Sequence, residues 1–399
     1  MLPAEQPAWQ LVVGTLAEVA ELYGYRRIQT PNFEDTEVFA RTAGAGSDVV
    51  QKEMYTFEDR GGRSLTLKPE GTAPIARAYI EDGMQREPQP VKLYTVAPMY
   101  RYATPQKGRY REHWQCSVEA IGAADPALDA ELIQLYTEFA RRVGITQYEL
   151  QLNSIGDAAC RPAYVERLTH WLDEHADVLD EDARAKRVTN PLRVFDVKSA
   201  AVREALRAAP KIGESLCTEC AAHFAEVRRL LDAYGVPYTL EPTLVRGLDY
   251  YTRTVFEFVG PEEKAQSAIC SGGRYDGLIE EIGGAPTPGI GFGAGIERAL
   301  IALEAEGRKG VEPTLDVFFV ADGDGARGRV PPLLAALRRA GLSADTDYAG
   351  RSFKGQMTQA GRTGAATVVV VRGDDATIRR GGKDEQVVAL DEVVATLTA

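Results

Sequence analysis

The sequence predicts an α+β fold: an antiparallel sheet with helices and a helical insertion, followed by a small C-terminal α/β domain. Three observations support this. Between residues 54 and 122, extended segments alternate apolar and polar side chains around polar turns. Residues from about 160 to 238 are charge-rich and helical in pattern, without strand signals. Beyond Leu315, short strand and helix patterns alternate.

The first predicted element is an amphipathic helix over residues 5–25. Apolar side chains recur there at three- and four-residue spacing and form one broad face, among them Trp9, Val12, Leu16, Val19 and Tyr23. Pro31 then excludes a helix and favours an extended segment. Residues 54–69 alternate around Gly61 and Gly62, which predicts a hairpin.

Two further strands are predicted on either side of a polar loop. They cover residues 90–102 and 113–122, and antiparallel pairing is the simplest arrangement. A helix over 125–143 and a strand over 148–154 follow. After the insertion, extended patterns resume at 243–259 and 267–273, and a Gly-rich segment leads into a helix within 286–307.

These patterns divide the chain into a larger and a smaller part. The predicted first domain covers residues 1–306 and contains the helical insertion at about 160–238. Residues 307–314 are predicted to be a linker, because Gly, Lys and Pro interrupt the periodic patterns. The predicted α/β domain covers residues 315–399. The chain's 399 residues, 44% of them hydrophobic, suffice for two or three packed domains.

Composition narrows the possible functions. A formal net charge of -12 disfavours attraction of the whole surface to nucleic acid or anionic lipid, so any polyanion must be bound locally. The five cysteines are odd in number and sparse, which is typical of a reducing cytoplasm rather than a secreted disulfide framework. No signal peptide and no run of about 18 uncharged apolar residues occurs, so we expect a cytoplasmic protein without a membrane span.

The polar loop after residue 100 is the first candidate for chemistry. It holds four cations within eleven residues, namely Arg101, Lys107, Arg109 and Arg111. Guanidinium groups match phosphate oxygens and keep their charge, so the loop could bind a triphosphate. A solvated, charged hairpin tip would have the same composition, and the loop alone does not distinguish the two.

Three other segments are candidates. Glu70, Gly71 and Thr72 follow a strand and could receive a substrate amine, although an exposed turn would look the same. Arg246, with its neighbours Tyr250 and Tyr251, lies in an apolar strand context where a buried arginine needs a partner, which favours a site. The glycines before Arg298 lack the context of a dinucleotide-binding motif and are a weak signal.

Cys217, Cys220 and His223 have metal-compatible spacing. A fourth ligand is missing nearby in the sequence, so ordinary helical thiols are favoured and no metal site is expected.

Taken in order, five segments resemble the histidyl-tRNA synthetases, a class II aminoacyl-tRNA synthetase family. They are "KEMYTFEDRGGRSLTLKPEGTAP", "PMYRYATPQKGRYREHWQCSVEAIG", "LVRGLDYYTRTVFEF", "SGGRYDGLI" and "GIGFGAGIERAL". The resemblance covers nearly the whole chain, and "RGLDYY" is specific to the histidine branch. It implies a six-stranded antiparallel catalytic sheet with a helical insertion and an anticodon-binding C-terminal domain. It further implies activation of L-histidine with ATP and Mg²⁺, transfer to tRNA(His), and a homodimer.

The resemblance also implies roles for single residues. Arg101 and Arg246 match arginines that act on the α-phosphate and substrate carboxylate, and are the expected catalytic residues. The implied ATP contacts are Arg101, Arg109, Arg111 and Arg298. The implied histidine contacts are Glu70, Gly71, Thr72, Gln115, Glu119, Arg246, Tyr250 and Tyr251, with Glu119 and Tyr251 at the imidazole ring.

Two departures from the family pattern stand out. Ala103 occupies a position that is usually acidic, and the sequence starts at "MLPAEQP", whereas relatives usually carry a short preceding segment. Ala103 gives some support to an alternative function, a catalytically inactive synthetase-like regulatory subunit of ATP phosphoribosyltransferase in histidine biosynthesis. The histidine-contact set and the C-terminal α/β domain argue against it. A third possibility, a tRNA-binding protein without catalysis, would not need Arg101, Arg109 and Arg298 together.

Overall fold

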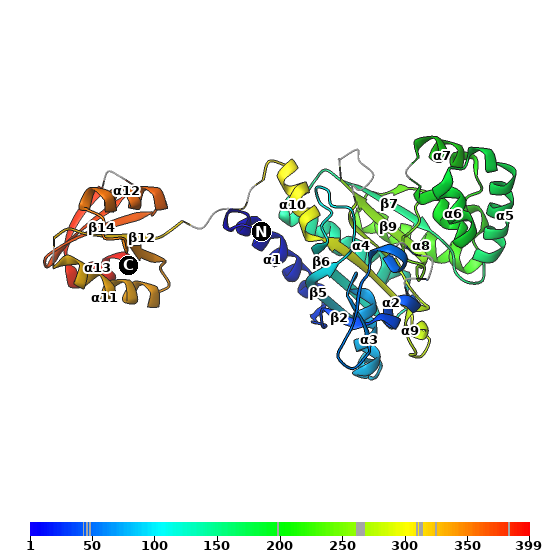
Figure 1. Cartoon of the computed structure of the whole chain (residues 1–399), viewed down its shortest axis with the longest axis horizontal. Coiled ribbons are helices and arrows are strands. Elements are labelled where there is room, and N and C mark those ends of the chain that lie inside the picture. The colour runs from blue at the N-terminus through cyan, green and yellow to red at the C-terminus, as the bar shows by residue number, and fades with distance from the viewer. Residues whose placement is uncertain are drawn as a thin grey trace. The chain divides into compact units, whose positions relative to one another are not determined.

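The computed structural model describes residues 1–399 except 43, 45–46, 48, 198, 261–267, 309, 311–313, 324 and 382–383. The chain forms two compact units, Met1–Gly310 and Val311–Ala399 (Figure 1). Residues 309 and 311–313 of the predicted linker lie outside the described residues. Within the described parts of the chain, no helix is long and apolar enough to cross a membrane.

The first unit is built on an eight-stranded sheet. The strand order is β1-β5-β6-β11-β10-β9-β7-β8. The bounds are β1 Arg26–Arg27, β5 Val91–Tyr100, β6 Glu112–Ile121, β11 Gly289–Gly295, β10 Ala268–Arg274, β9 Thr252–Val259, β7 Glu149–Ser154 and β8 Thr239–Leu240. The six inner strands pair antiparallel, and the two-residue edge strands β1 and β8 add parallel. The predicted fold class is therefore confirmed, with two short strands added at the edges.

Helices cover one face of this sheet. They are α1 (Gln6–Leu22), α4 (Pro126–Val143), α8 (Thr218–Tyr234) and α10 (Ile296–Ala305). In the helix predicted over residues 5–25, Val12, Leu16, Val19 and Ala20 are buried, as the periodicity requires. They share one apolar core with α4, whose buried stripe includes Tyr136 and Phe139, and with inward-facing residues of the strands.

A second layer stands on the opposite face. A small sheet has the order β2-β4-β3, with bounds Phe33–Asp35, Ser64–Leu67 and Tyr55–Glu58. The predicted hairpin is confirmed: β3 and β4 pair antiparallel, and Gly62 turns the chain with φ of +77°. Nearby are α2 (Thr36–Thr42), the π-helical turn Val49–Glu53, α3 (Thr72–Glu81), the turn Met84–Arg86 and α9 (Leu278–Glu281).

The segment between β7 and β8 forms helices joined by turns, with no strand among its described residues. It contains α5 (Arg161–Glu174), α6 (Glu181–Thr189), α7 (Ala200–Ala205) and α8, with short 3₁₀ turns at Ala176–Val178, Pro191–Asp196, Leu206–Ala208 and Ile212–Ser215. Its apolar side chains join those of α3 and of Tyr250 and Tyr251 in a second core. The helices α5 to α7 gather on one side of the sheet (Figure 1), whereas α8 packs on α4.

The second unit is a five-stranded sheet with the order β13-β12-β14-β15-β16. The bounds are β13 Ala344–Thr346, β12 Val317–Ala321, β14 Thr367–Arg372, β15 Asp375–Arg380 and β16 Asp384–Ala389. Successive residues of β12 face opposite sides: Phe319 joins the core with α11 (Ala326–Arg339) and α13 (Val393–Thr398), while Phe318 joins the core with α12 (Phe353–Thr363). A 3₁₀ turn, Leu390–Glu392, precedes α13.

Strand β15 was not expected from the sequence. "DATIRR" is short and half of it is charged, so its alternation is a weak local signal. It becomes a strand because Gly373, with φ of +57°, lets the chain reverse and pair with β14. Register with a neighbouring strand, rather than intrinsic preference, decides this element.

Candidate active site

A cavity of about 280 Å³ opens over the middle of the large sheet. Nine of the side chains singled out from the sequence line it: Glu70, Thr72, Arg101, Arg109, Gln115, Arg246, Tyr250, Tyr251 and Arg298. They come from the start of α3, the loop between β5 and β6, β6 itself, the segment before β9 and the start of α10. The sheet therefore brings together segments more than two hundred residues apart.

Glu70 lies at the N-terminus of α3. Its carboxylate accepts hydrogen bonds from the N–H groups of Thr72 at 2.7 Å and Ala73 at 2.8 Å, which satisfies donors that a helix start leaves unpaired. Burial raises the pKa of Glu70, although these N–H groups and Arg101 act in the opposite direction. Gly71 is needed beside it, because a Cβ there would lie 2.2 Å from the Ser117 hydroxyl.

Glu119 lies beneath the cavity, fully buried on β6. The Thr72 hydroxyl donates to one carboxylate oxygen at 2.7 Å and the Tyr275 hydroxyl donates to the other at 2.6 Å. Burial raises the pKa of Glu119 well above its usual value despite these two donors, and the nearby Glu70 raises it further. Two buried acids thus stand close together, joined through Thr72.

The glycines of β11 make room for β6. Gly291 is paired with Glu119, and a Cβ at Gly291 would lie 1.8 Å from the Glu119 carboxylate. A Cβ at Gly293 would lie 2.6 Å from the amide nitrogen of Gln115. The glycine run before α10 is therefore a sheet strand whose missing side chains leave space for polar groups on its neighbour.

Arg246 is held from two sides. One guanidinium nitrogen pairs with the Glu257 carboxylate, and the other donates to the Ser271 hydroxyl at 2.6 Å. Burial disfavours its charge, but Glu257 together with Tyr251 and Asp196 outweighs that effect and raises the pKa of Arg246. The sequence argument that a buried arginine needs a partner is confirmed, and the partner comes from β9.

Three arginines gather around the loop between β5 and β6. Arg101 donates to the Pro69 carbonyl at 2.8 Å, and Arg109 pairs with Glu53. Arg298, on α10, donates to the carbonyls of Gly108 at 3.2 Å and Ala268 at 2.8 Å. Because Arg298 bonds the loop tip, the loop folds over the cavity instead of projecting into solvent as a plain charged hairpin.

Comparisons with known proteins show which family this chain resembles. A family model described as histidyl-tRNA synthetase matches residues 1–299. A protein of Moorella thermoacetica named histidine--tRNA ligase is 50% identical over 372 residues, which cover 93% of this chain and 88% of the relative. The structure of apo Staphylococcus aureus histidyl-tRNA synthetase matches with a TM-score of 0.84 and 38% identity, over 100% of this chain and 97% of that one.

The chain belongs to the histidyl-tRNA synthetase family. A Bacillus halodurans structure titled as an ATP phosphoribosyltransferase regulatory subunit/histidyl-tRNA synthetase also matches, with a TM-score of 0.67 and 24% identity over 93% of this chain and 96% of that one. At that identity the likeness shows a shared fold and nothing more specific.

Three of the residues expected in this histidyl-tRNA synthetase site do not line the cavity. Gly71 packs against Ser117, and Glu119 lies behind Thr72. Arg111 donates to the Ala103 carbonyl at 3.5 Å, and its guanidinium lies 4.1 Å from the centre of the Tyr102 ring. Arg111 thus contacts its own loop, while Ala103, where the family pattern has an acid, is buried at the cavity wall.

Several contributing residues were missed from the sequence. Glu53, Ser271, Glu257 and Tyr275 hold the predicted residues in place, and His113 lines the cavity. Glu53 and Ser271 carry no local signal, because their role arises only from partners on other segments. His113 could have been noticed, since it is one of only four histidines and stands two residues before Gln115.

His113 should remain neutral in the folded protein under mildly acidic conditions. Burial and the charges of Arg101, Arg298 and Arg109 lower its pKa from 6.5 to about 3. In the unfolded chain His113 binds a proton below about pH 6.5, whereas in the folded chain it does so only near pH 3. The folded state therefore loses stability as the pH falls through this window. The loss is at most about 1.4 kcal/mol per pH unit.

Urea unfolding of the wild type and of His113→Phe, at neutral pH and at about pH 5, measures this contribution. The phenylalanine keeps a ring but cannot titrate. As the pH falls, we expect the unfolding free energy of the wild type to decrease more than that of the variant. Parallel pH dependences would show that His113 titrates alike in the folded and unfolded chains.

Proposed function

We propose that the chain activates L-histidine with ATP to form histidyl-adenylate and then transfers the histidyl group to tRNA(His). The observation that carries this proposal is the cavity itself, where the Glu70 carboxylate and neutral polar side chains that suit an amino acid meet a cluster of arginines that suits phosphates. The two sets share one cavity, so a carboxylate and a phosphate could be held side by side.

Histidine would bind at the Glu70 end. The carboxylate of Glu70 already accepts two backbone N–H groups, yet it keeps lone pairs that can accept an ammonium group. Gln115, Tyr250 and Tyr251 would contact the rest of the substrate. Glu119 would act on the imidazole from behind Thr72, with Thr72 and Tyr275 fixing its two oxygens. A ligand that left a buried polar group of the site unpaired would lose about 1 to 3 kcal/mol of binding.

The nucleotide would bind among the arginines. Arg101 and Arg246 would act on the α-phosphate, and Arg109 and Arg298 on the rest of the triphosphate. Arg111 would contribute through the loop it steadies rather than by direct contact. Because these groups are held by Pro69, Glu257, Glu53 and Gly108 before any ligand arrives, they need little rearrangement to offset phosphate charge.

The proposed chemistry needs no protein nucleophile. A carboxylate oxygen of histidine attacks the α-phosphorus, the bond to the bridging oxygen breaks, and pyrophosphate leaves; the tRNA terminal hydroxyl later takes the histidyl group and releases AMP. The arginines offset the charge built at phosphorus, and positioning supplies the rest. Glu70 is the one carboxylate among the described residues lining the cavity, so Mg²⁺ would arrive bound to ATP rather than in a protein cage.

The regulatory-subunit alternative is not favoured. The likeness to relatives named histidine--tRNA ligase extends over 93% of the chain, and the chain includes the α/β unit Val311–Ala399. Arg101, Arg109 and Arg298 all meet at the cavity, which a subunit that only sensed histidine would not require. A cytoplasmic location and a homodimer complete the proposal.

Histidine-dependent exchange of pyrophosphate into ATP tests the proposed function. Purified full-length protein with Mg²⁺ should catalyse the exchange with L-histidine and not with other amino acids. Glu70→Gln keeps the shape of the side chain but removes its charge, and should raise the KM for histidine more than the KM for ATP. If the wild type binds histidine and stimulates an ATP phosphoribosyltransferase but catalyses no exchange, the regulatory alternative is correct.

A further inference from the structure

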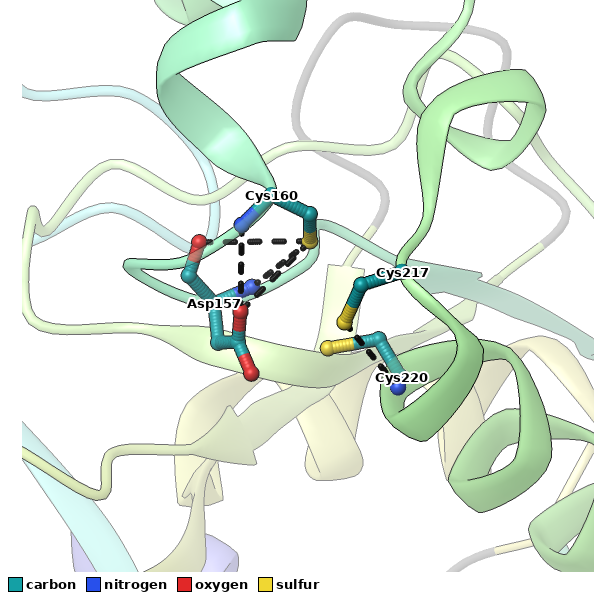
Figure 2. Close-up of side chains that lie close together, drawn as sticks. All are labelled: Asp157, Cys160, Cys217 and Cys220. Carbon is teal, nitrogen blue, oxygen red and sulfur yellow. Dashed lines mark hydrogen bonds between the residues drawn. The ribbon is translucent and has the colours of Figure 1, made fainter.

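Four potential metal ligands lie close together outside the cavity lining. Asp157 and Cys160 lie in the turn between β7 and α5, and Cys217 and Cys220 lie at the start of α8 (Figure 2). One ligand atom from each lies within 4.8 Å of the others. We call these four residues the Cys-Asp cluster.

His223, which the sequence spacing grouped with Cys217 and Cys220, does not join this cluster. His223 shares the spacing of Cys217 and Cys220, but its Nε2 lies 2.8 Å from the carboxylate of buried Asp129. The remaining ligands come instead from Asp157 and Cys160, in a segment distant in sequence that the fold carries to the start of α8. The reason for expecting no metal, a missing fourth ligand, therefore does not hold in the folded chain.

We propose that the Cys-Asp cluster binds one zinc ion in a closed, structural site. Thiolates favour Zn²⁺ over Mg²⁺ or Ca²⁺, and zinc also accepts carboxylate oxygen. Three sulfurs and one carboxylate complete a tetrahedral shell, leaving no position for substrate or an activated water. The site would therefore stabilise structure and take no part in the reaction. It does not depend on the proposed function.

The local backbone suits metal-bound sulfur. The ligands form two pairs, each spaced by three residues, and each pair directs a backbone N–H at a sulfur: Asp157 N–H to Cys160 Sγ at 3.4 Å, and Cys220 N–H to Cys217 Sγ at 3.4 Å. Such donors favour the thiolate and fix the direction of the ligand. Cys217 also caps α8, where the partial positive charge of the helix start favours an anion.

The surroundings leave room for the cluster and support its charge. Gly156 has φ of +63°, and a Cβ there would lie 2.6 Å from Cys160 Sγ. Oxygen Oδ1 of Asp157 accepts N–H groups of Ala159 at 3.0 Å and Cys160 at 3.3 Å, while Oδ2 lies 3.3 Å from Arg253. A zinc ion with four anionic ligands carries excess negative charge, which Arg253 would offset.

Zinc in the Cys-Asp cluster would stabilise the packing of the helical insertion against residues 251–253, which follow Tyr250 of the cavity. Arg253 has φ of +50°, which is unusual for a residue with a side chain. Its N–H donates to the Gly156 carbonyl at 2.7 Å, and its carbonyl accepts from the Ile155 N–H at 2.8 Å. Arg161, next to Cys160, donates to the Tyr251 carbonyl at 2.7 Å. The ion would thus tie the starts of α5 and α8 together beneath Tyr251.

Metal analysis of full-length protein tests this inference. Protein purified under reducing conditions without chelator, in a form lacking a histidine tag, should contain about one zinc per chain. Cys160→Ser and Cys220→Ser should reduce zinc to background. The matched control is Cys116→Ala, which alters a buried thiol in the sheet core outside the cluster and should keep its zinc.

A second measurement remains informative if a serine variant fails to fold. Asp157→Cys should still bind one zinc, and cobalt added to this variant and to the wild type should produce the visible absorption of tetrahedral thiolate-bound cobalt. Zinc-free, reduced wild type that takes up neither metal would overturn the inference, as would a Cys217–Cys220 disulfide in the freshly isolated protein. Because none of these readouts uses catalysis, their failure is distinct from failure of pyrophosphate exchange.

Discussion

Replacing Arg246 by alanine is expected to lower the rate of histidyl-adenylate formation about 10²- to 10³-fold, the range found when a preorganised charge-stabilising donor is removed. The Arg246 side chain is 16% exposed, lines the cavity and is already oriented by Glu257 and Ser271. Its loss removes positive charge where charge would develop at the α-phosphate. Single-turnover adenylate formation, with ATP binding measured separately, gives the effect; ATP affinity should change far less than the rate.

Two conservative variants sharpen this test. Arg246→Lys keeps the charge but lacks the planar guanidinium that contacts Glu257 and Ser271 at the same time. It should therefore recover only part of the rate. Ser271→Ala removes one orienting contact and leaves the charge, so its loss should be smaller than that of Arg246→Ala. An Arg246→Ala enzyme with an unchanged rate would remove Arg246 from the proposed chemistry.

The largest expected effect on stability is at Asp129. Asp129 and Arg274 form a pair and are both fully buried. The other oxygen of the Asp129 carboxylate lies at hydrogen-bond distance, 2.8 Å, from His223 Nε2. Asp129→Ala would leave the Arg274 guanidinium buried without its main counter-charge. Because breaking a buried pair from one side typically costs about 3–5 kcal/mol, we expect a loss of that size in the unfolding free energy, measured by urea denaturation.

The matched control is a carboxylate in an exposed pair. Glu226→Ala removes the partner of Arg229 on the surface of α8 and should leave the urea midpoint nearly unchanged. A double variant, Asp129→Leu with Arg274→Met, removes both charges and should recover much of the loss, because no unpaired charge remains. Equal midpoints for Asp129→Ala and Glu226→Ala would contradict a structural role for the buried pair.

Local patterns predicted most elements of the fold. The helix near the N-terminus, the Gly61–Gly62 hairpin and the strands flanking residues 101–111 follow from periodicity and turn residues, and these signals agree with the tertiary packing. Strand β15 and the two-residue strand β8 were not predicted, and β1 was expected only as part of an extended segment. They are strands because a neighbour pairs with them, and no short stretch of sequence contains that information.

The candidate site shows the same division. Residues belonging to the quoted motifs could be named because the resemblance supplied their roles, and nine of them line one cavity. Glu53, Ser271 and Glu257 also lie in the quoted segments, but the resemblance gave them no role, and each acts by holding an arginine that folding brings to it. The setting of His113 among three arginines likewise exists only once the loop has folded back.

Periodicity and motif order along the chain predicted most of the elements, two regions of different pattern on either side of residues 307–314, and the family. Those properties depend on neighbours along the chain and on the order of motifs. The tertiary structure alone decided why β11 is glycine-rich, which acid lies beneath Thr72, and that Asp157 and Cys160 meet Cys217 and Cys220. These are contacts between distant segments, which exist only after the sheet has assembled and the insertion has packed against it.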